Sequence, residues 1–224
     1  MNEDDLSADD FASRFQRETR PRCQLYLVSS PDLAGSSPER LKQVLGSGEV
    51  AAFQLRLKAL DDDEIARLAE PLQRICADHD VAFILNDNAA LAAKIGADGV
   101  HLGQSDGSVA EARALLGREA QIGITCHASR HLAMEAAEAG ADYVAFGSFY
   151  PSATKTSEHR PEPSILSWWT TLFGTPCVAI GGIMPCNAAP LVAAGADYLA
   201  VSSAIWNAPD MADAVRAFER VMSG

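Results

Sequence analysis

The chain has 224 residues, of which 48% are hydrophobic and 21% charged, the balance of a folded protein with an extensive core. Against 30 Asp and Glu there are only 18 Lys and Arg, so the formal net charge is −12 at pH 7. This acid excess argues against nucleic acid as a partner, because phosphate backbones attract basic surfaces. Many acids lie at the start of the chain, and residues 1–20 are expected to form an acidic N-terminal extension to one domain over residues 21–224.

Targeting and redox signals point to the cytoplasm. No window approaches the roughly 20 apolar residues that span a bilayer, and the acidic start lacks the pattern of a signal peptide. The five cysteines are far apart and form no C-x-x-C pair, which favours buried thiols in a reducing compartment over disulfides. We therefore expect a cytoplasmic protein with no membrane partner, and a homo-oligomer is compatible with the sequence.

Short, continuously apolar runs are predicted to be strands of a parallel sheet covered by helices, because they lack the alternation of a half-exposed sheet. In chain order they are Gln24–Ser29, Ala51–Leu55, Val81–Leu85, Gly99–Leu102, Ile122–Thr125, Tyr143–Phe146, Cys177–Ile180 and Tyr198–Val201.

The stretches between these runs have the spacing of amphipathic helices. In Asp61–Asp80, for example, apolar residues recur three and four positions apart, and acids at its start complement the helix dipole. The other predicted helices are Pro38–Leu45, Ala89–Ile95, Val109–Leu116, Arg130–Ala139, Pro163–Phe173, Asn187–Ala194 and Ala212–Met222.

One turn occurs three times in the sequence. Gly-Ala-Asp precedes a predicted strand at 96–98, 140–142 and 195–197, with the glycine at a helix end. Eight strands, eight helices and a repeated turn predict an α/β protein with a closed (β/α)8 barrel, or TIM barrel. An open doubly wound sheet is the alternative, and eight units fit closure better.

In such barrels, chemistry lies where the strands end. After the second strand, Gln54, Arg56 and Lys58 alternate with leucines and therefore share one face. Basic side chains at a barrel mouth are costly without an anion, so the pattern indicates an anion site. The alternative is that Arg56 and Lys58 only pair with carboxylates at the rim.

Two carboxylates follow neighbouring strands. Asn86 and Asp87 end the third strand, and Asp106 follows the fourth. Carboxylate and amide oxygens at one rim suit Mg2+, which takes few carboxylates and keeps other positions for water and phosphate. Helix capping is the alternative, with Asp87 at the start of the helix near Ala89 and Asp106 at that near Val109.

Hydroxyls and glycines follow the later strands. The loop after the sixth strand carries Ser152, Thr154 and Lys155, which could clamp a phosphate or simply be solvated. Glycines after the seventh strand, including Gly182, allow backbone N–H groups to approach a ligand. Ser202 and Ser203 end the eighth strand, and the last two strand ends are the usual phosphate site of barrels.

The remaining polar residues favour structural interpretations. Cys126 and His127 are adjacent on a strand, so their side chains point apart and cannot form a nucleophile–base pair. His101, within an apolar strand, is interpreted as structural. Trp168 and Trp169 are expected to pack a helix against the barrel or to form an oligomer contact.

Together these motifs resemble the thiamine-phosphate synthase family. The resemblance rests on Gln54-x-Arg56-x-Lys58, Asn86-Asp87, the run 99–104 with Asp106, Pro151-x-x-Thr154-Lys155 and the run 179–183, all in order at successive strand ends. It implies an enzyme that couples hydroxymethylpyrimidine diphosphate to hydroxyethylthiazole phosphate, with Mg2+, and releases pyrophosphate.

The resemblance also implies residue roles. Asp87 and Asp106 would hold Mg2+, whereas Arg56, Lys58, Asn86 and Lys155 would bind the diphosphate and the departing pyrophosphate. Gln54 and Thr125 would contact the pyrimidine, and Thr154, Gly182, Ser202 and Ser203 would hold the thiazole phosphate. Ser152 would also bind substrate. Thr125 stands where the family usually has Ser, and the loop after Lys155 lacks the family's glycines.

Two other functions are considered. A thiazole tautomerase-like paralogue would need no diphosphate site, and His127 lies where such an enzyme could place an acid or base. A non-catalytic thiamine-phosphate binder would need neither metal nor diphosphate residues. Because Asp87, Asp106 and Lys155 are all present, the synthase is favoured over both.

Overall fold

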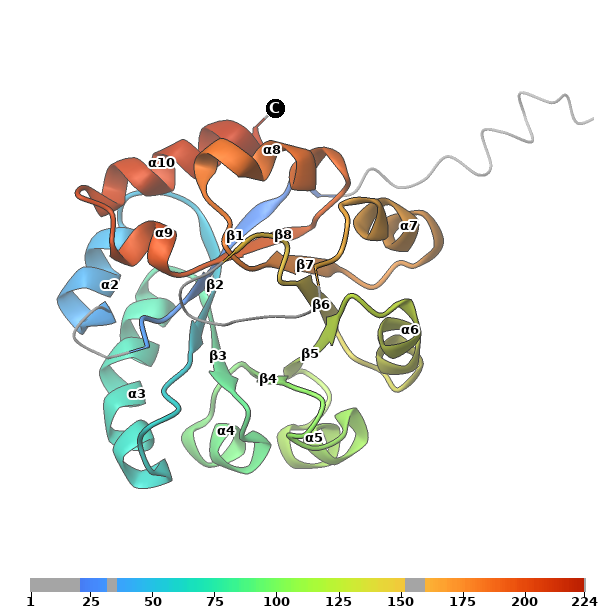
Figure 1. Ribbon diagram of the computed structural model, residues 1–224. Helices are drawn as coiled ribbons and strands as arrows, with labels where there is room; N and C mark the ends of the chain where they lie inside the picture. The colour runs from blue at the N-terminus through green and yellow to red at the C-terminus, as the bar shows by residue number, and fades with distance from the viewer. Residues whose placement is uncertain (1–20, 32–35, 152–159, 224) are drawn as a thin grey trace, which may run out of the picture.

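Eight parallel strands close into a barrel with helices around its outside in the computed structural model, which describes residues 21–31, 36–151 and 160–223 (Figure 1). The strands are β1 (Gln24–Val28), β2 (Val50–Leu55), β3 (Ala82–Asn86), β4 (Gly99–Leu102), β5 (Gln121–His127), β6 (Tyr143–Gly147), β7 (Cys177–Ile180) and β8 (Tyr198–Val201). β8 pairs with β1 through Gln24–Tyr198 and the three following positions, which closes the barrel. The predicted (β/α)8 barrel is thereby confirmed.

The helices fall between the strands, as expected. They are α2 (Pro38–Leu45), α3 (Asp62–Asp78), α4 (Ala89–Ile95), α5 (Val109–Leu116), α6 (Arg130–Glu138), α7 (Ser164–Leu172), α8 (Pro185–Ala193), α9 (Ser203–Trp206) and α10 (Met211–Met222). Within the described ranges, no helix is both long and apolar enough to cross a membrane. The proposed extension over residues 1–20 lies outside the described residues.

Apolar side chains fill both faces of the strands, which explains the continuous apolar runs. The barrel interior holds the small cluster Tyr26, Val28, Ala52, Ile84, Tyr143, Ala145, Val178 and Ala200. The larger cluster lies between strands and helices. There Trp169 of α7 is fully buried, stacks on Phe173 at 4.1 Å between ring centroids and meets Phe146 of β6 edge-on at 5.8 Å. Trp169 thus packs its helix against the barrel, as predicted.

The repeated Gly-Ala-Asp turn links each new strand to the previous one. The aspartate N–H donates to a carbonyl of the previous strand, and its carboxylate accepts the N–H of that same residue. The pairs are Asp98 with Phe83, Asp142 with Ile122 and Asp197 with Cys177, with N–H to carboxylate distances of 2.7, 2.7 and 2.8 Å. The repeat therefore sets the alignment of three strand pairs: β3–β4, β5–β6 and β7–β8.

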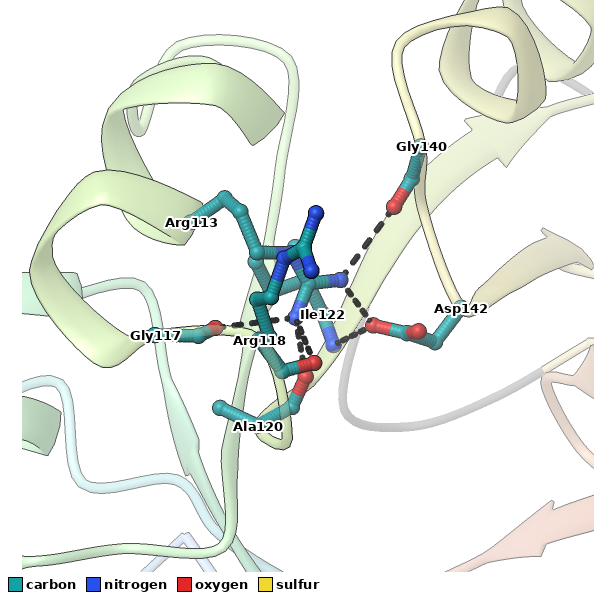
Figure 2. A network of polar contacts seen from close by, with 7 residues as sticks. All are labelled: Arg113, Gly117, Arg118, Ala120, Ile122, Gly140 and Asp142. Atoms are coloured by element: carbon teal, nitrogen blue, oxygen red, sulfur yellow. Dashed lines mark hydrogen bonds and ion pairs between the residues drawn. The ribbon is translucent and has the colours of Figure 1, made fainter.

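The middle copy of this turn has an additional partner (Figure 2). The Arg113 guanidinium reaches from α5 to the Asp142 carboxylate. It also donates to the carbonyls of Gly117, Arg118, Ala120 and Gly140. One side chain thus holds the end of α5, the start of β5 and the turn before β6 together.

Removing the Asp142 carboxylate is expected to destabilise the barrel more than removing its counterpart Asp98. Asp142→Ala leaves the Ile122 N–H and part of the Arg113 guanidinium without a partner, so we expect the free energy of unfolding to fall by about 2–3 kcal/mol. Asp98→Ala removes the acceptor of the Phe83 N–H and should cost about 1–2 kcal/mol. Urea denaturation of both variants measures the difference, and equal losses would contradict a role for Arg113.

Several elements differ by a residue or two at their ends, and two differ more substantially from the sequence prediction. β5 is longer than Ile122–Thr125, because a bulge between Thr125 and His127 lets the strand continue beside β6. The short helix α9 was not predicted, since four residues carry no periodicity. It is held by tertiary contacts, including a 2.7 Å hydrogen bond from the Trp206 indole to the Val28 carbonyl.

The cysteines are largely as expected. Cys23, Cys76, Cys126 and Cys177 are buried, and burial raises the pKa of the first three thiols to about 12. Cys186 departs from the expectation, because it lies in the first turn of α8 and is exposed.

Candidate active site

The carboxyl end of β2 carries three candidate side chains at alternate positions. Gln54 lies in the barrel interior and is 4% exposed, Arg56 is half-buried and Lys58 is exposed. The Ser29 hydroxyl, at the end of β1, accepts the Arg56 N–H at 2.9 Å and donates to the Arg56 carbonyl at 3.4 Å. This reciprocal contact joins the ends of β1 and β2 and sets where the Arg56 side chain leaves the barrel.

Asp87 occupies a tight turn immediately after β3. The residues on either side of Asp87 are hydrogen-bonded to each other, since the Asn88 N–H donates to the Asn86 carbonyl at 2.9 Å. Asp87 itself has a φ of +68°. Its own N–H donates to the His101 carbonyl of β4 at 2.8 Å. A non-glycine residue in this left-handed region is uncommon, and such strain is concentrated at functional sites.

Helix capping, the alternative role for both aspartates, is wrong. The N-cap of α4 is Asn88, whose side chain accepts the Leu91 N–H. The N-cap of α5 is Ser108, which forms a capping box with Glu111. Asp106 instead accepts the Gly103 N–H at 2.8 Å and the Ser105 hydroxyl at 3.3 Å within the loop after β4.

The two carboxylates and one cation form a small charged cluster. Lys58 Nζ lies 3.1 Å from an Asp87 carboxylate oxygen, so the rim pairing proposed for Lys58 does occur, with another candidate residue. Burial and the neighbouring Asp106 raise the pKa of Asp87, against the opposing effect of Lys58. Burial opposes ionisation of Asp106, but the Gly103 N–H, Asp87, the Ser105 hydroxyl and Lys58 lower its pKa overall.

This cluster is chemically suited to share a divalent cation with a ligand. In the described part of the chain, no three His, Cys, Asp or Glu side chains gather as a self-sufficient metal site. Two carboxylates near each other suit a hard ion such as Mg2+, which takes its remaining oxygens from water and phosphate.

Thr125 lies near the end of β5, beside the bulge. Its hydroxyl is 2.8 Å from Nε2 of His101, which points into the barrel from β4. Cys126 packs in the outer cluster, on the face opposite Thr125. The bulge thus keeps Thr125 inside the barrel while it alters the course of the residues after it.

Gly182 and Ser202 lie just after the carboxyl ends of the last two strands, β7 and β8. Gly182 has a φ of +62°, and a Cβ there would overlap the Pro151 carbonyl oxygen, so only glycine fits. The Ser202 hydroxyl donates to the Ser29 carbonyl at 3.0 Å, which joins the ends of β8 and β1. Ser203 begins α9 and is exposed, whereas Ser152, Thr154 and Lys155 lie outside the described residues.

Sequence reasoning missed the polar side chains inside the barrel. Tyr26 and Tyr143 are buried with their hydroxyls 2.9 Å apart, and Tyr143 also contacts His101. The available signal was their position: each lies on the interior face of a strand, where small apolar residues predominate. Their partners come from strands far apart in sequence and therefore leave no local motif.

The fold and this geometry define a class: a (β/α)8-barrel protein with paired carboxylates and cations at the carboxyl ends of its strands, the arrangement in which phosphorylated ligands are bound. Residues 25–205 match the model of the thiamine monophosphate synthase family. The chain therefore belongs to that family, and the resemblance seen in its motifs is confirmed.

Individual relatives agree. The chain is 61% identical over 205 residues to the thiamine-phosphate synthase of Erythrobacter litoralis, which covers 90% of this chain and 96% of that protein. It is 51% identical over 205 residues to that of Rhodospirillum centenum, with 90% and 99% covered. Among solved structures, thiamine phosphate pyrophosphorylase from Pyrococcus furiosus superposes with a TM-score of 0.79 at 28% identity, over 89% of this chain and 95% of that one. These relatives favour the synthase over the tautomerase and the non-catalytic binder.

Proposed function

We propose that this protein is a transferase that joins hydroxymethylpyrimidine diphosphate to hydroxyethylthiazole phosphate, forming thiamine phosphate and releasing pyrophosphate. The observation that carries the proposal is the Lys58–Asp87–Asp106 cluster at the barrel mouth, in a chain 61% identical to a protein named thiamine-phosphate synthase. Neither aspartate caps a helix, so neither carboxylate is committed to a helix N-terminus.

Asp87 and Asp106 are proposed to hold Mg2+. When bound, the ion would neutralise negative charge on the diphosphate and on the pyrophosphate that leaves. The residues suit it, because two oxygen ligands from the protein leave positions for water and diphosphate oxygens. Burial and the neighbouring Asp106 raise the pKa of Asp87, and a bound cation would oppose both effects.

The cations are proposed to stabilise the leaving group. Arg56, Lys58 and Lys155 would bind the diphosphate, together with the Asn86 amide. The carbon–oxygen bond to the diphosphate breaks with its electron pair on oxygen, and charge develops on the departing group. Fixed cations placed around that charge lower the barrier without any enzymic nucleophile.

The second half of the reaction is proposed to depend on orientation. The thiazole nitrogen supplies its lone pair to the exocyclic carbon of the pyrimidine, so the new carbon–nitrogen bond forms without loss of a proton. Gln54 and Thr125 would hold the pyrimidine, and Ser152, Thr154, Gly182, Ser202 and Ser203 the thiazole phosphate. Holding both substrates adjacent replaces a costly encounter in solution.

The remaining features of the proposal concern the whole chain. Residues 21–224 would form the catalytic barrel and residues 1–20 an acidic extension. The partners of the protein would be small phosphorylated molecules in the cytoplasm, with neither nucleic acid nor membrane among them. The protein would also be able to form a homo-oligomer. The net charge of −12 supports the exclusion of nucleic acid.

Pyrophosphate release tests the proposal. Purified protein is given the pyrimidine diphosphate with and without the thiazole phosphate and Mg2+, and thiamine phosphate is measured in parallel. We expect release that needs all three, with thiamine phosphate formed in equal amount. Release of pyrophosphate without coupling, or no release at all, would contradict the assignment, and isomerisation of a thiazole carboxylate would identify the tautomerase instead.

A further inference from the structure

A continuous chain of hydrogen-bonded side chains crosses the barrel interior. Gln54 Nε2 donates to the Tyr26 hydroxyl at 3.1 Å, and the Tyr26 and Tyr143 hydroxyl oxygens are 2.9 Å apart. The Tyr143 hydroxyl is 3.1 Å from His101 Nδ1, and His101 Nε2 is 2.8 Å from the Thr125 hydroxyl. This series of hydrogen bonds, called the interior chain below, thus connects Gln54 and Thr125, the two side chains proposed to contact the pyrimidine.

Apolar side chains surround the interior chain of hydrogen bonds. Tyr26 and Gln54 are each 4% exposed, Tyr143 7% and His101 9%. Around the tyrosines lie the aliphatic side chains of the interior cluster, including Val28, Ile84 and Val178. Burial also raises the pKa of both tyrosine hydroxyls well above its ordinary value, so each keeps its proton. In such surroundings an unpaired polar atom is costly, which favours a chain in which every hydrogen bond is formed.

The proton count gives this chain a direction. Each tyrosine hydroxyl has one proton to donate. Because Tyr26 accepts from the Gln54 amide nitrogen, its own proton would be free to go to Tyr143. If every hydrogen bond in this series is formed, Tyr143 would donate to His101 Nδ1, and the imidazole would carry its proton on Nε2 and donate it to Thr125.

This direction determines which hydrogen-bond donors and acceptors Thr125 and Gln54, at the two ends, can offer to a ligand. With the proton on Nε2, Thr125 would accept from His101, and its own hydroxyl proton would be directed to another acceptor. Gln54 uses one N–H on Tyr26 and retains its carbonyl oxygen and its second N–H. A donor at one end and an acceptor at the other complement an aminopyrimidine, which offers ring nitrogens as acceptors and an exocyclic amine as donor.

We infer that Tyr26, Tyr143 and His101 are positioning residues, which fix the orientation of the Gln54 amide and the Thr125 hydroxyl for an aminopyrimidine. The inference rests on the proposed function and deepens it, because it assigns the barrel interior to recognition of one substrate. Reversal of the chain would make Thr125 an acceptor and turn the Gln54 amide around. All five groups therefore act as one unit.

Tyr26→Phe tests the inference, because it removes the hydroxyl that Gln54 contacts and keeps the ring. With no partner to hold its amide, Gln54 is expected to bind the pyrimidine diphosphate less well, and KM for that substrate should rise about tenfold. KM for the thiazole phosphate should stay within about twofold, since its site is separate. Tyr198→Phe is the matched control, because Tyr198 packs against the same interior cluster but is not a member of the chain. Thermal unfolding of each variant separates a change in recognition from a loss of stability.

A second measurement reads the chain without any substrate. Heteronuclear NMR of the imidazole nitrogens, assigned with His101→Asn, should show His101 protonated on Nε2 in the wild type. In Tyr26→Phe that preference should weaken, and in Tyr198→Phe it should not. A His101 protonated on Nδ1 in the wild type would overturn the direction of the chain.

The outcomes separate the inference from the proposed function. A wild-type protein that forms no thiamine phosphate would overturn the proposed function and the substrate assignment with it. An active wild type, with Tyr26→Phe unchanged in KM for the pyrimidine diphosphate or raised equally for both substrates, would overturn the positioning role alone.

Discussion

Replacing Asp87 by asparagine is expected to lower kcat/KM for coupling by about a hundred- to a thousandfold, the usual cost of one electrostatic stabiliser. Asparagine has the same shape and tolerates the φ of +68° that the turn requires, so the fold should not change. The change removes one of the two carboxylates and the ion pair with Lys58. The Mg2+ concentration needed for half-maximal rate should therefore rise sharply.

Asp63→Asn is a matched control for this prediction. Asp63 accepts from Lys94 at 3.1 Å, the same distance that separates Lys58 and Asp87, but the pair joins the exposed surfaces of α3 and α4. Rates are measured across an Mg2+ titration for both variants and the wild type. An Asp87→Asn titration that superposes on that of Asp63→Asn would show that Asp87 has no part in metal binding.

The barrel was predictable because each of its strands is buried on both faces. β4, β7 and β8, together with α2, α4 and α5, have the bounds expected from apolar runs and helical spacing. The Gly-Ala-Asp repeat was visible as well, although its physical role was not. Only the structure shows that the aspartate carboxylate accepts an N–H from the previous strand, because that partner lies 15 or 20 residues earlier in the sequence.

The site was only partly accessible from sequence. Strand ends located Asp87 and Asp106, but spacing alone left capping open. The Ser108-x-x-Glu111 pattern was a readable sign that another residue caps α5, and Asn88 is the corresponding residue for α4. The interior chain could not be predicted, because Tyr26 and Tyr143 meet across 117 positions of sequence and only barrel closure brings them together.

Gly182→Ala is expected to have the second large effect. Gly182 needs its φ of +62°, and an added Cβ would overlap the backbone oxygen of Pro151. The backbone cannot easily shift to relieve this overlap. The Tyr150 N–H donates to the Gly181 carbonyl at 3.0 Å, and the Asn187 side chain donates to the Gly182 carbonyl at 3.1 Å. We expect a loss of about 2–3 kcal/mol in the free energy of unfolding from strain and overlap together. The catalytic efficiency with thiazole phosphate should fall about a hundredfold, because the added methyl group pushes the backbone at Pro151 and at Gly182 apart.

Gly96→Ala distinguishes overlap from backbone strain. Gly96 has a φ of +66°, close to that of Gly182, but nothing lies within 4 Å of an added Cβ, and the residue ends α4. Its variant should lose only the strain contribution, about 1 kcal/mol, and retain the wild-type kinetics. Because the two glycines have similar φ angles, any further loss in Gly182→Ala is attributed to the contacts with Pro151 and Tyr150. If Gly182→Ala bound the thiazole phosphate as well as Gly96→Ala does, the end of β7 would not form part of the thiazole phosphate site.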